Sequence, residues 1–214
     1  MQFALERSVE RQAFLHDRSK RAGCVRKAQI VEVKARIVKL CGVSFVAEAH
    51  RLGMRVLLDW VANHTARDAR WIAEKPASWY ERDAADRDVW RAQADAMEFW
   101  LTQHDVDGFR CDMAMLVPIE FWNETSLRLR RVKPDLFMLA EAEEPYLFEA
   151  GAFDACYAWE MHHLMNDVAQ QKVRVTALRD YIYADRNRYP QSAMRLVFTS
   201  NHDENSWNGS EFTR

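Results

Sequence analysis

Four apolar segments of this chain each end in acidic or other polar residues, and this recurrence constrains the fold most. They are MRVLLDW (54–60), VDGFRCD (106–112), DLFMLAE (135–141) and MRLVFTS (194–200). Near-continuous apolar runs of this length are typical of strands buried on both faces of a parallel sheet. Because helical patterns separate them, the sequence predicts consecutive parallel β/α units, with the polar strand ends gathered at one edge of the sheet.

The segments between these strands supply helix signals. We predict helices over 43–52, from Asp86 or Asp88 to Val106, from Pro118 to Pro134, over 161–171 and over 176–187. A fifth strand is predicted over 153–159. The connection over 65–87 is polar and short, and it contains several aromatic residues.

Composition limits the class of protein. With 214 residues, 49% of them hydrophobic, the chain predicts one sizeable folded domain. A net charge of -2 gives no general attraction to nucleic acid or to an anionic membrane. Neither an 18-residue apolar run nor a secretion signal is present, so we expect a cytoplasmic product by default, although a longer parent protein can be secreted or periplasmic. Four cysteines without C-x-x-C spacing indicate neither a zinc site nor a disulfide framework.

The first 42 residues differ from the rest. Residues 1–45 carry ten Lys and Arg against four Asp and Glu, without a sustained apolar stripe. Within them, residues 30–40 are compatible with a strand or with a short basic helix. We therefore divide the chain into a basic segment of uncertain structure, 1–42, and one β/α domain, 43–214.

Arg110 and Asp112 stand two residues apart at the end of the second apolar segment. Positions i and i+2 of a strand project to the same face, and a guanidinium there keeps the carboxylate ionised and lowers its pKa. An ionised, oriented aspartate is what nucleophilic catalysis on a sugar carbon needs. The alternative is an ordinary ion pair that closes a strand.

Taken together, LLDWVANHT (57–65), GFRCD (108–112), LAEAEEP (139–145) and FTSNHDEN (198–205) resemble the four characteristic regions of the α-amylase family, glycoside hydrolase family 13. The resemblance implies a partial TIM (β/α)8 barrel that supplies roughly strands three to seven, with a very short excursion after strand three. It also implies a retaining hydrolase that cleaves α-1,4-glucosidic bonds in starch-like glucans. A truncated, inactive remnant that at most binds glucan or another chain is the alternative, and the oligomeric state stays open.

The resemblance also assigns catalytic roles. Asp112 matches the nucleophile, Glu141 the general acid/base, and Asp203 the carboxylate that stabilises the transition state. Glu143 and Glu144 follow Glu141 closely, and neighbouring negative charge raises the pKa of a carboxyl group. Spacing alone does not choose among these three glutamates, and a solvated acidic loop is the alternative.

Further residues match binding positions of the family. His64, Arg110 and His202 match substrate-binding residues, and Asp59 matches a residue that orients the arginine. Asn63 matches a position that often binds calcium, which needs six to eight oxygen ligands. Calcium is the one cofactor that the resemblance suggests, and the short connection over 65–87 offers little room for the other ligands. The pair His162-His163 lacks the H-E-x-x-H spacing of a zinc protease, and Trp60 can stack on a sugar or pack in the core.

Overall fold

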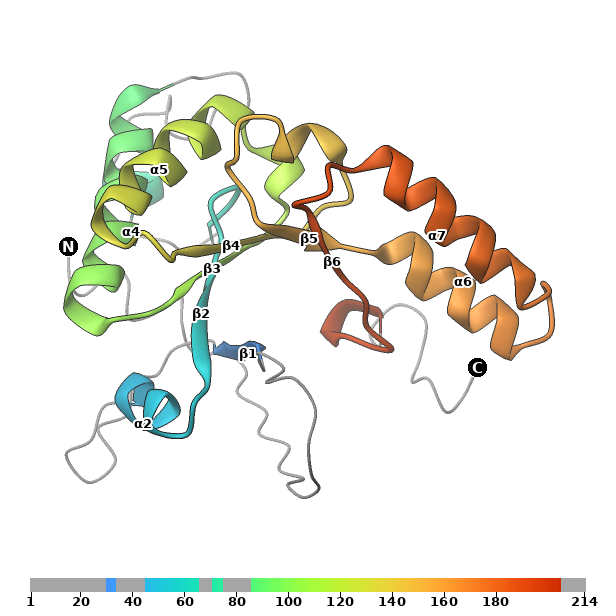
Figure 1. Ribbon diagram of the computed structural model, residues 1–214. Helices are drawn as coiled ribbons and strands as arrows, with labels where there is room; N and C mark the ends of the chain where they lie inside the picture. The colour runs from blue at the N-terminus through green and yellow to red at the C-terminus, as the bar shows by residue number, and fades with distance from the viewer. Residues whose placement is uncertain (1–29, 34–44, 66–70, 75–85, 205–214) are drawn as a thin grey trace.

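A computed structural model describes residues 30–33, 45–65, 71–74 and 86–204 of the chain. Its centre is a six-stranded sheet in which every pairing is parallel and the strands follow one another in chain order (Figure 1). The strands are β1 (Ile30–Val33), β2 (Arg55–Trp60), β3 (Gly108–Cys111), β4 (Phe137–Ala140), β5 (Ala155–Tyr157) and β6 (Met194–Leu196).

Helices connect these strands. They are α2 (Phe45–Arg51), α3 (Trp71–Glu74), α4 (Arg87–His104), α5 (Ile119–Val132), α6 (Trp159–Ala169) and α7 (Thr176–Arg188), with short 3-10 helices η2 (Ala114–Leu116) and η3 (Pro145–Phe148). Asp86, and not Asp88, caps α4, because its carboxylate accepts hydrogen bonds from the backbone N–H of Asp88 and Val89. Figure 1 shows α4 beside α5 and α6 beside α7.

The pleat gives the sheet two distinct faces, since alternate side chains of a strand point in opposite directions. One face packs against α2, α4 and α5 in the main core, through side chains that include Leu58, Phe109 and Met138. The other carries Asp59 on β2, which pairs in register with Arg110 on β3, and Arg110 pairs with Leu139 on β4. We call this second side the site face.

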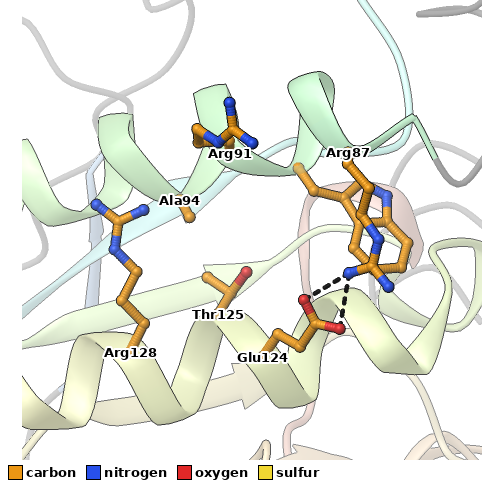
Figure 2. A pocket seen from close by; sticks show the side chains of 7 residues that line it. Arg87, Arg91, Ala94, Glu124, Thr125 and Arg128 are labelled. Atoms are coloured by element: carbon orange, nitrogen blue, oxygen red, sulfur yellow. Dashed lines mark hydrogen bonds and ion pairs between the residues drawn. The ribbon is translucent and has the colours of Figure 1, made fainter.

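Helices α4 and α5 pack together over the main core and leave a pocket between them (Figure 2). Arg87 crosses the pocket to Glu124, with Nη1 2.7 and 2.6 Å from the two carboxylate oxygens. Arg91 lies 3.4 Å from Asp88, and Arg128 pairs with two acidic side chains of α4. Each of the three arginines that line this pocket therefore already pairs with an acidic side chain of α4 or α5.

The sequence predictions for the fold are confirmed in their main features. All five predicted strands are present and parallel, with helices between them, as expected for part of a β/α barrel. For residues 30–40 the sequence allows a strand or a helix, and the structure has a strand at Ile30–Val33 beside β2. The sheet therefore includes one strand from the segment 1–42, most of which lies outside the described residues, as does most of the 65–87 connection.

Two further observations concern the cysteines and the apolar character of the helices. Cys111 and Cys156 are buried free thiols, and Cys24 and Cys41 lie outside the described residues. Within the described ranges, none of the helices combines the length and the apolar character that a membrane crossing would require.

We expect the close contact of β3 with β4 at Gly108 to tolerate no side chain. A Cβ atom added to Gly108 would lie 1.8 Å from the carbonyl oxygen of Phe137. Gly108→Ala should therefore reduce the free energy of unfolding by at least about 3 kcal/mol, because the two strands must separate. Urea denaturation measures this change.

Gly151→Ala is the matched control. Gly151 has a φ of 73° but open space around its Cβ position, so alanine there costs only backbone strain of about 1 kcal/mol. Equal losses in the two variants would contradict the tight approach of β3 to β4.

Candidate active site

A single buried arginine joins the carboxyl ends of three neighbouring strands. Arg110, on β3, is 2% exposed and projects from the site face. Its Nη1 atom lies 2.8 Å from Oδ1 of Asp59 and 2.8 Å from Oδ1 of Asp112, and its Nη2 lies 2.5 Å from Oε1 of Glu141. The Tyr157 hydroxyl, on β5, accepts a longer hydrogen bond of 3.4 Å from Nε.

This arrangement follows from strand parity and register. Asp59 and Arg110 are register partners, so their side chains project side by side. Asp112 is two residues beyond Arg110 and therefore points to the same face. Glu141 directly follows β4, two residues after Leu139, and its N–H donates to the Cys111 carbonyl. The predicted convergence of Asp112 and Glu141 is thus present in the structure.

The second oxygen of Glu141 is held by the backbone. Oε2 accepts a 2.9 Å hydrogen bond from the N–H of Met113. Met113 has a φ of 44°, a left-handed conformation that non-glycine residues adopt at an energetic cost. Both carboxyl oxygens of Glu141 are therefore fixed, one by a cation and one by a strained turn directly after Asp112.

The environment of Glu141 favours its protonated form. Burial is the largest cause and raises its pKa to about 7, with the charges of Asp112 and Asp203 acting in the same direction. Arg110 and the Met113 N–H lower the pKa but do not cancel this effect. The pKa lies where a group can donate a proton and take one back near neutral pH.

Glu143 and Glu144 are not the source of this shift, so the sequence-based reason for it was wrong. Glu144 is exposed. The carboxylate of Glu143 pairs with Arg195 and accepts a hydrogen bond of 2.9 Å from the N–H of Glu160. Among the three glutamates of this strand end, only Glu141 contacts Arg110 within the described structure.

Arg110 keeps its own charge in spite of its burial. Burial by itself lowers the pKa of a guanidinium, but Tyr157, Asp59 and Glu141 raise the pKa of Arg110 above its ordinary value. One cation facing three carboxylates leaves two excess negative charges if all three ionise. A neutral Glu141 reduces that excess, which agrees with its raised pKa.

Asp112 presents its two oxygens differently. Oδ1 binds Arg110, whereas Oδ2 is buried and accepts no hydrogen bond from the described residues. The backbone N–H of Asp112 donates to the Trp60 carbonyl at 2.9 Å, which fixes the residue against β2. Arg110 therefore orients this carboxylate, while one of its oxygens is left for another partner.

Asp203 and His202 lie in the segment after β6. His202 Nε2 is 3.3 Å from Oδ2 of Asp203, and Asp203 is half-exposed. The charge of Asp203 acts on Glu141, so Asp203 lies at the same end of the sheet. The structure thus joins Asp112 and Glu141 through Arg110, whereas no described hydrogen bond or ion pair joins Asp203 to either of them.

The positions of His64 and Asn63 do not test the roles predicted for them. Both are exposed in the segment after β2, and no described hydrogen bond or ion pair joins either to the carboxylates. One amide oxygen from Asn63 falls short of the six to eight that calcium needs, and much of the following connection lies outside the described residues. Calcium at Asn63 and sugar binding by His64 therefore stay predictions.

Sequence reasoning missed two contributors to the site. Tyr157 closes one side of Arg110, and its position at the end of β5 was the available signal. Met113 acts through its backbone conformation, for which the sequence carries no glycine or asparagine signal. Trp60 is buried in the main core, so its role is packing and not stacking on a sugar.

Comparison with known proteins shows what the chain as a whole is similar to. No family model matches the chain. α-Amylase MalA of Haloarcula japonica is 28% identical over 187 residues, which cover 75% of this chain and 28% of that protein. A cyclomaltodextrinase of Geobacillus thermopakistaniensis is 25% identical over 203 residues, covering 75% of this chain and 34% of the relative.

Two solved amylase structures are also similar to this chain. The maltogenic α-amylase AmyB of Thermotoga neapolitana aligns with a TM-score of 0.67 at 31% identity, over 74% of this chain and 41% of that one. An α-amylase of Lactobacillus plantarum aligns with a TM-score of 0.66 at 28% identity, over 74% of this chain and 44% of the other. Over about three quarters of its length, the chain is similar to amylases and a cyclomaltodextrinase.

This relationship confirms the resemblance found in the sequence and the partial barrel expected from it. The chain spans about a quarter to a third of the length of the first two curated amylase-family relatives. It spans less than half of the two amylase structures.

We expect Arg110→Met to destabilise the protein by about 3 kcal/mol or more, because it leaves buried acidic groups without their cation. Adding Asp59→Asn to that variant should restore part of the loss, since it removes one of the uncompensated charges. Urea denaturation of the single and double variants measures both effects.

Arg128→Met provides the matched control. Arg128 also bridges two carboxylates, Asp95 and Glu98, but its side chain is 39% exposed. Its loss should cost less than about 1 kcal/mol. If Arg110→Met cost no more than Arg128→Met, the buried arginine would not organise the site.

Proposed function

We propose that this chain carries the catalytic centre of a retaining glycoside hydrolase that cleaves α-1,4-glucosidic bonds in starch-like glucans. The observation that supports this most directly is that Arg110 holds Asp112 and Glu141 on neighbouring guanidinium nitrogens. Two carboxyl groups on one guanidinium stay within a few ångströms of each other. That is compatible with the roughly 5 Å separation of the carboxyl pair in retaining enzymes.

In the first step, the proton of Glu141 passes to the glycosidic oxygen as the bond between that oxygen and the sugar C1 breaks. Oδ2 of Asp112 attacks C1 and forms a glycosyl ester. Two features support these roles: the pKa of Glu141 is raised to about 7, and Oδ2 accepts no hydrogen bond within the described structure. The glucan fragment leaves with the proton from Glu141.

In the second step, a water molecule attacks the same C1 carbon and Glu141, now ionised, accepts its proton. The ester bond to Asp112 breaks, and both carboxyl groups return to their starting states. Because C1 is inverted twice, the product keeps the α configuration. Arg110 stabilises the Asp112 carboxylate as the leaving group of this step.

Of the remaining predicted residues, Asp203, His202 and His64 bind substrate, and Arg110 positions the reacting groups. Asp203 and His202 lie next to each other in the segment after β6, where both are accessible to sugar hydroxyls, and the 3.3 Å contact between them orients both side chains. Arg110 contacts Asp112 and Glu141 from the buried side, so it positions the reacting carboxylates. His64, exposed after β2, is assigned to sugar binding by resemblance alone.

The alternative is a protein that binds glucan without cleaving it. The same carboxylates and histidines can hydrogen-bond to sugar hydroxyls in such a protein, so the presence of the residues does not separate the two functions. What separates them is dependence of turnover on Asp112 and Glu141, because a binding protein has no turnover to lose.

We expect Asp112→Asn to lower hydrolysis of a chromogenic maltooligosaccharide by at least about 1,000-fold, because an amide cannot form the glycosyl ester. Glu144→Gln is the matched control, since it removes an exposed acid three residues from Glu141 and should keep near-wild-type activity. Proton NMR of the first product should show the α-anomer. Equal rates for the wild type and Asp112→Asn would favour the binding protein.

A further inference from the structure

Two histidines and a glutamate form a separate cluster on α6 and the segment after β6. His162 and His163 are adjacent on α6, and Glu204 directly follows Asp203. His162 Nε2 lies 3.5 Å from Oε2 of Glu204, and His163 Nε2 lies 3.5 Å from Oε1 of the same carboxylate. One ligand atom from each of the three residues falls within 4.8 Å of the other two.

The ring of His162 is oriented for coordination. Its Nδ1 lies 3.2 Å from the carbonyl oxygen of Phe198, which only accepts hydrogen bonds. In the neutral ring, Nδ1 therefore carries the proton and Nε2 the lone pair, which accepts a hydrogen bond from the Asn166 side-chain nitrogen that a metal ion would replace. A backbone carbonyl on the other ring nitrogen is the usual support for a metal-bound histidine.

Packing also fixes the position of this ring. The His162 side chain is 1% exposed, and it stacks on the Phe198 ring with centroids 4.7 Å apart and an angle of 11° between the planes. Asn166, one helical turn later, places its side-chain nitrogen 3.2 Å from Nε2. His163 is 58% exposed and Glu204 is 14% exposed, so the cluster opens to solvent on one side.

The spacing suits a small tetrahedral metal. With ligands at about 2.0–2.1 Å, the edge of a tetrahedron around zinc measures about 3.3 Å. The separations of 3.5 Å between each Nε2 and a Glu204 oxygen are close to that edge, and the ligand atoms all lie within 4.8 Å of one another, so they must move closer together to bind one ion. Two imidazoles and one carboxylate are a ligand set that zinc uses, with water in the fourth position.

We propose that His162, His163 and Glu204 bind a divalent metal of the zinc class through the two Nε2 atoms and the carboxylate. Calcium does not fit, because it needs six to eight oxygen ligands and this cluster offers nitrogen. The site is distinct from Arg110 and its carboxylates, and it does not depend on the proposed hydrolysis.

A metal here would tie α6 to the segment that carries His202 and Asp203. Glu204 is adjacent to Asp203, so coordination of Glu204 restrains the position of the half-exposed carboxylate next to it. Because only the folded chain brings the three ligands together, metal binding stabilises the fold by mass action.

The test is zinc titration of the whole chain, without a polyhistidine tag, at about pH 7.5, where an ordinary imidazole is neutral. Competition with a chromogenic chelator should give one zinc ion per chain at the cluster. His163→Ala and Glu204→Gln should each weaken binding at least about 10-fold. His104→Gln, which removes a histidine from α4, should leave the affinity unchanged, and calcium should not displace the zinc.

Two further readouts exclude binding elsewhere. Saturating zinc should raise the melting temperature of the wild type but not that of His163→Ala. X-ray absorption should show nitrogen and oxygen neighbours at about 2.0–2.1 Å. The proposal is overturned if both ligand variants bind zinc as tightly as the wild type, if no zinc binds, or if sulfur appears at about 2.3 Å.

Discussion

The ion pairs of Arg110 are the interaction on which the site depends. Three neighbouring strands end in carboxylates, and the same buried guanidinium binds all of them. Without it, the acidic groups of Asp59, Asp112 and Glu141 would repel one another at the edge of the sheet. The arginine thus makes the cluster compatible with folding and also fixes the relative positions of the groups proposed to react.

The two carboxyl groups beside Arg110, those of Asp112 and Glu141, have different environments and therefore different proposed roles. Asp112 has one oxygen on the arginine and the other without a hydrogen bond in the described structure, as a nucleophile requires. Glu141 is buried, and burial favours its neutral form although Arg110 and the Met113 N–H favour the ionised one. Different environments around one cation therefore produce a proposed nucleophile and a proposed acid.

Much of the arrangement of the site was predictable from the sequence, because strand parity and the order of polar strand ends are local properties. Arg110 and Asp112 share a face for that reason alone. The cause of the raised pKa of Glu141 was not predictable, since it depends on burial and on Asp203, far along the chain. The cluster of His162, His163 and Glu204 was missed because its spacing fits no motif and α6 meets Glu204 only through the fold.

The most direct test of this account is an NMR titration of the side-chain carboxyl carbon of Glu141. We expect the midpoint near pH 7. An exposed glutamate, by comparison, loses its proton near pH 4.3. A Glu141 midpoint at the ordinary value of an exposed glutamate would contradict the claim that burial beside Arg110 keeps this acid protonated.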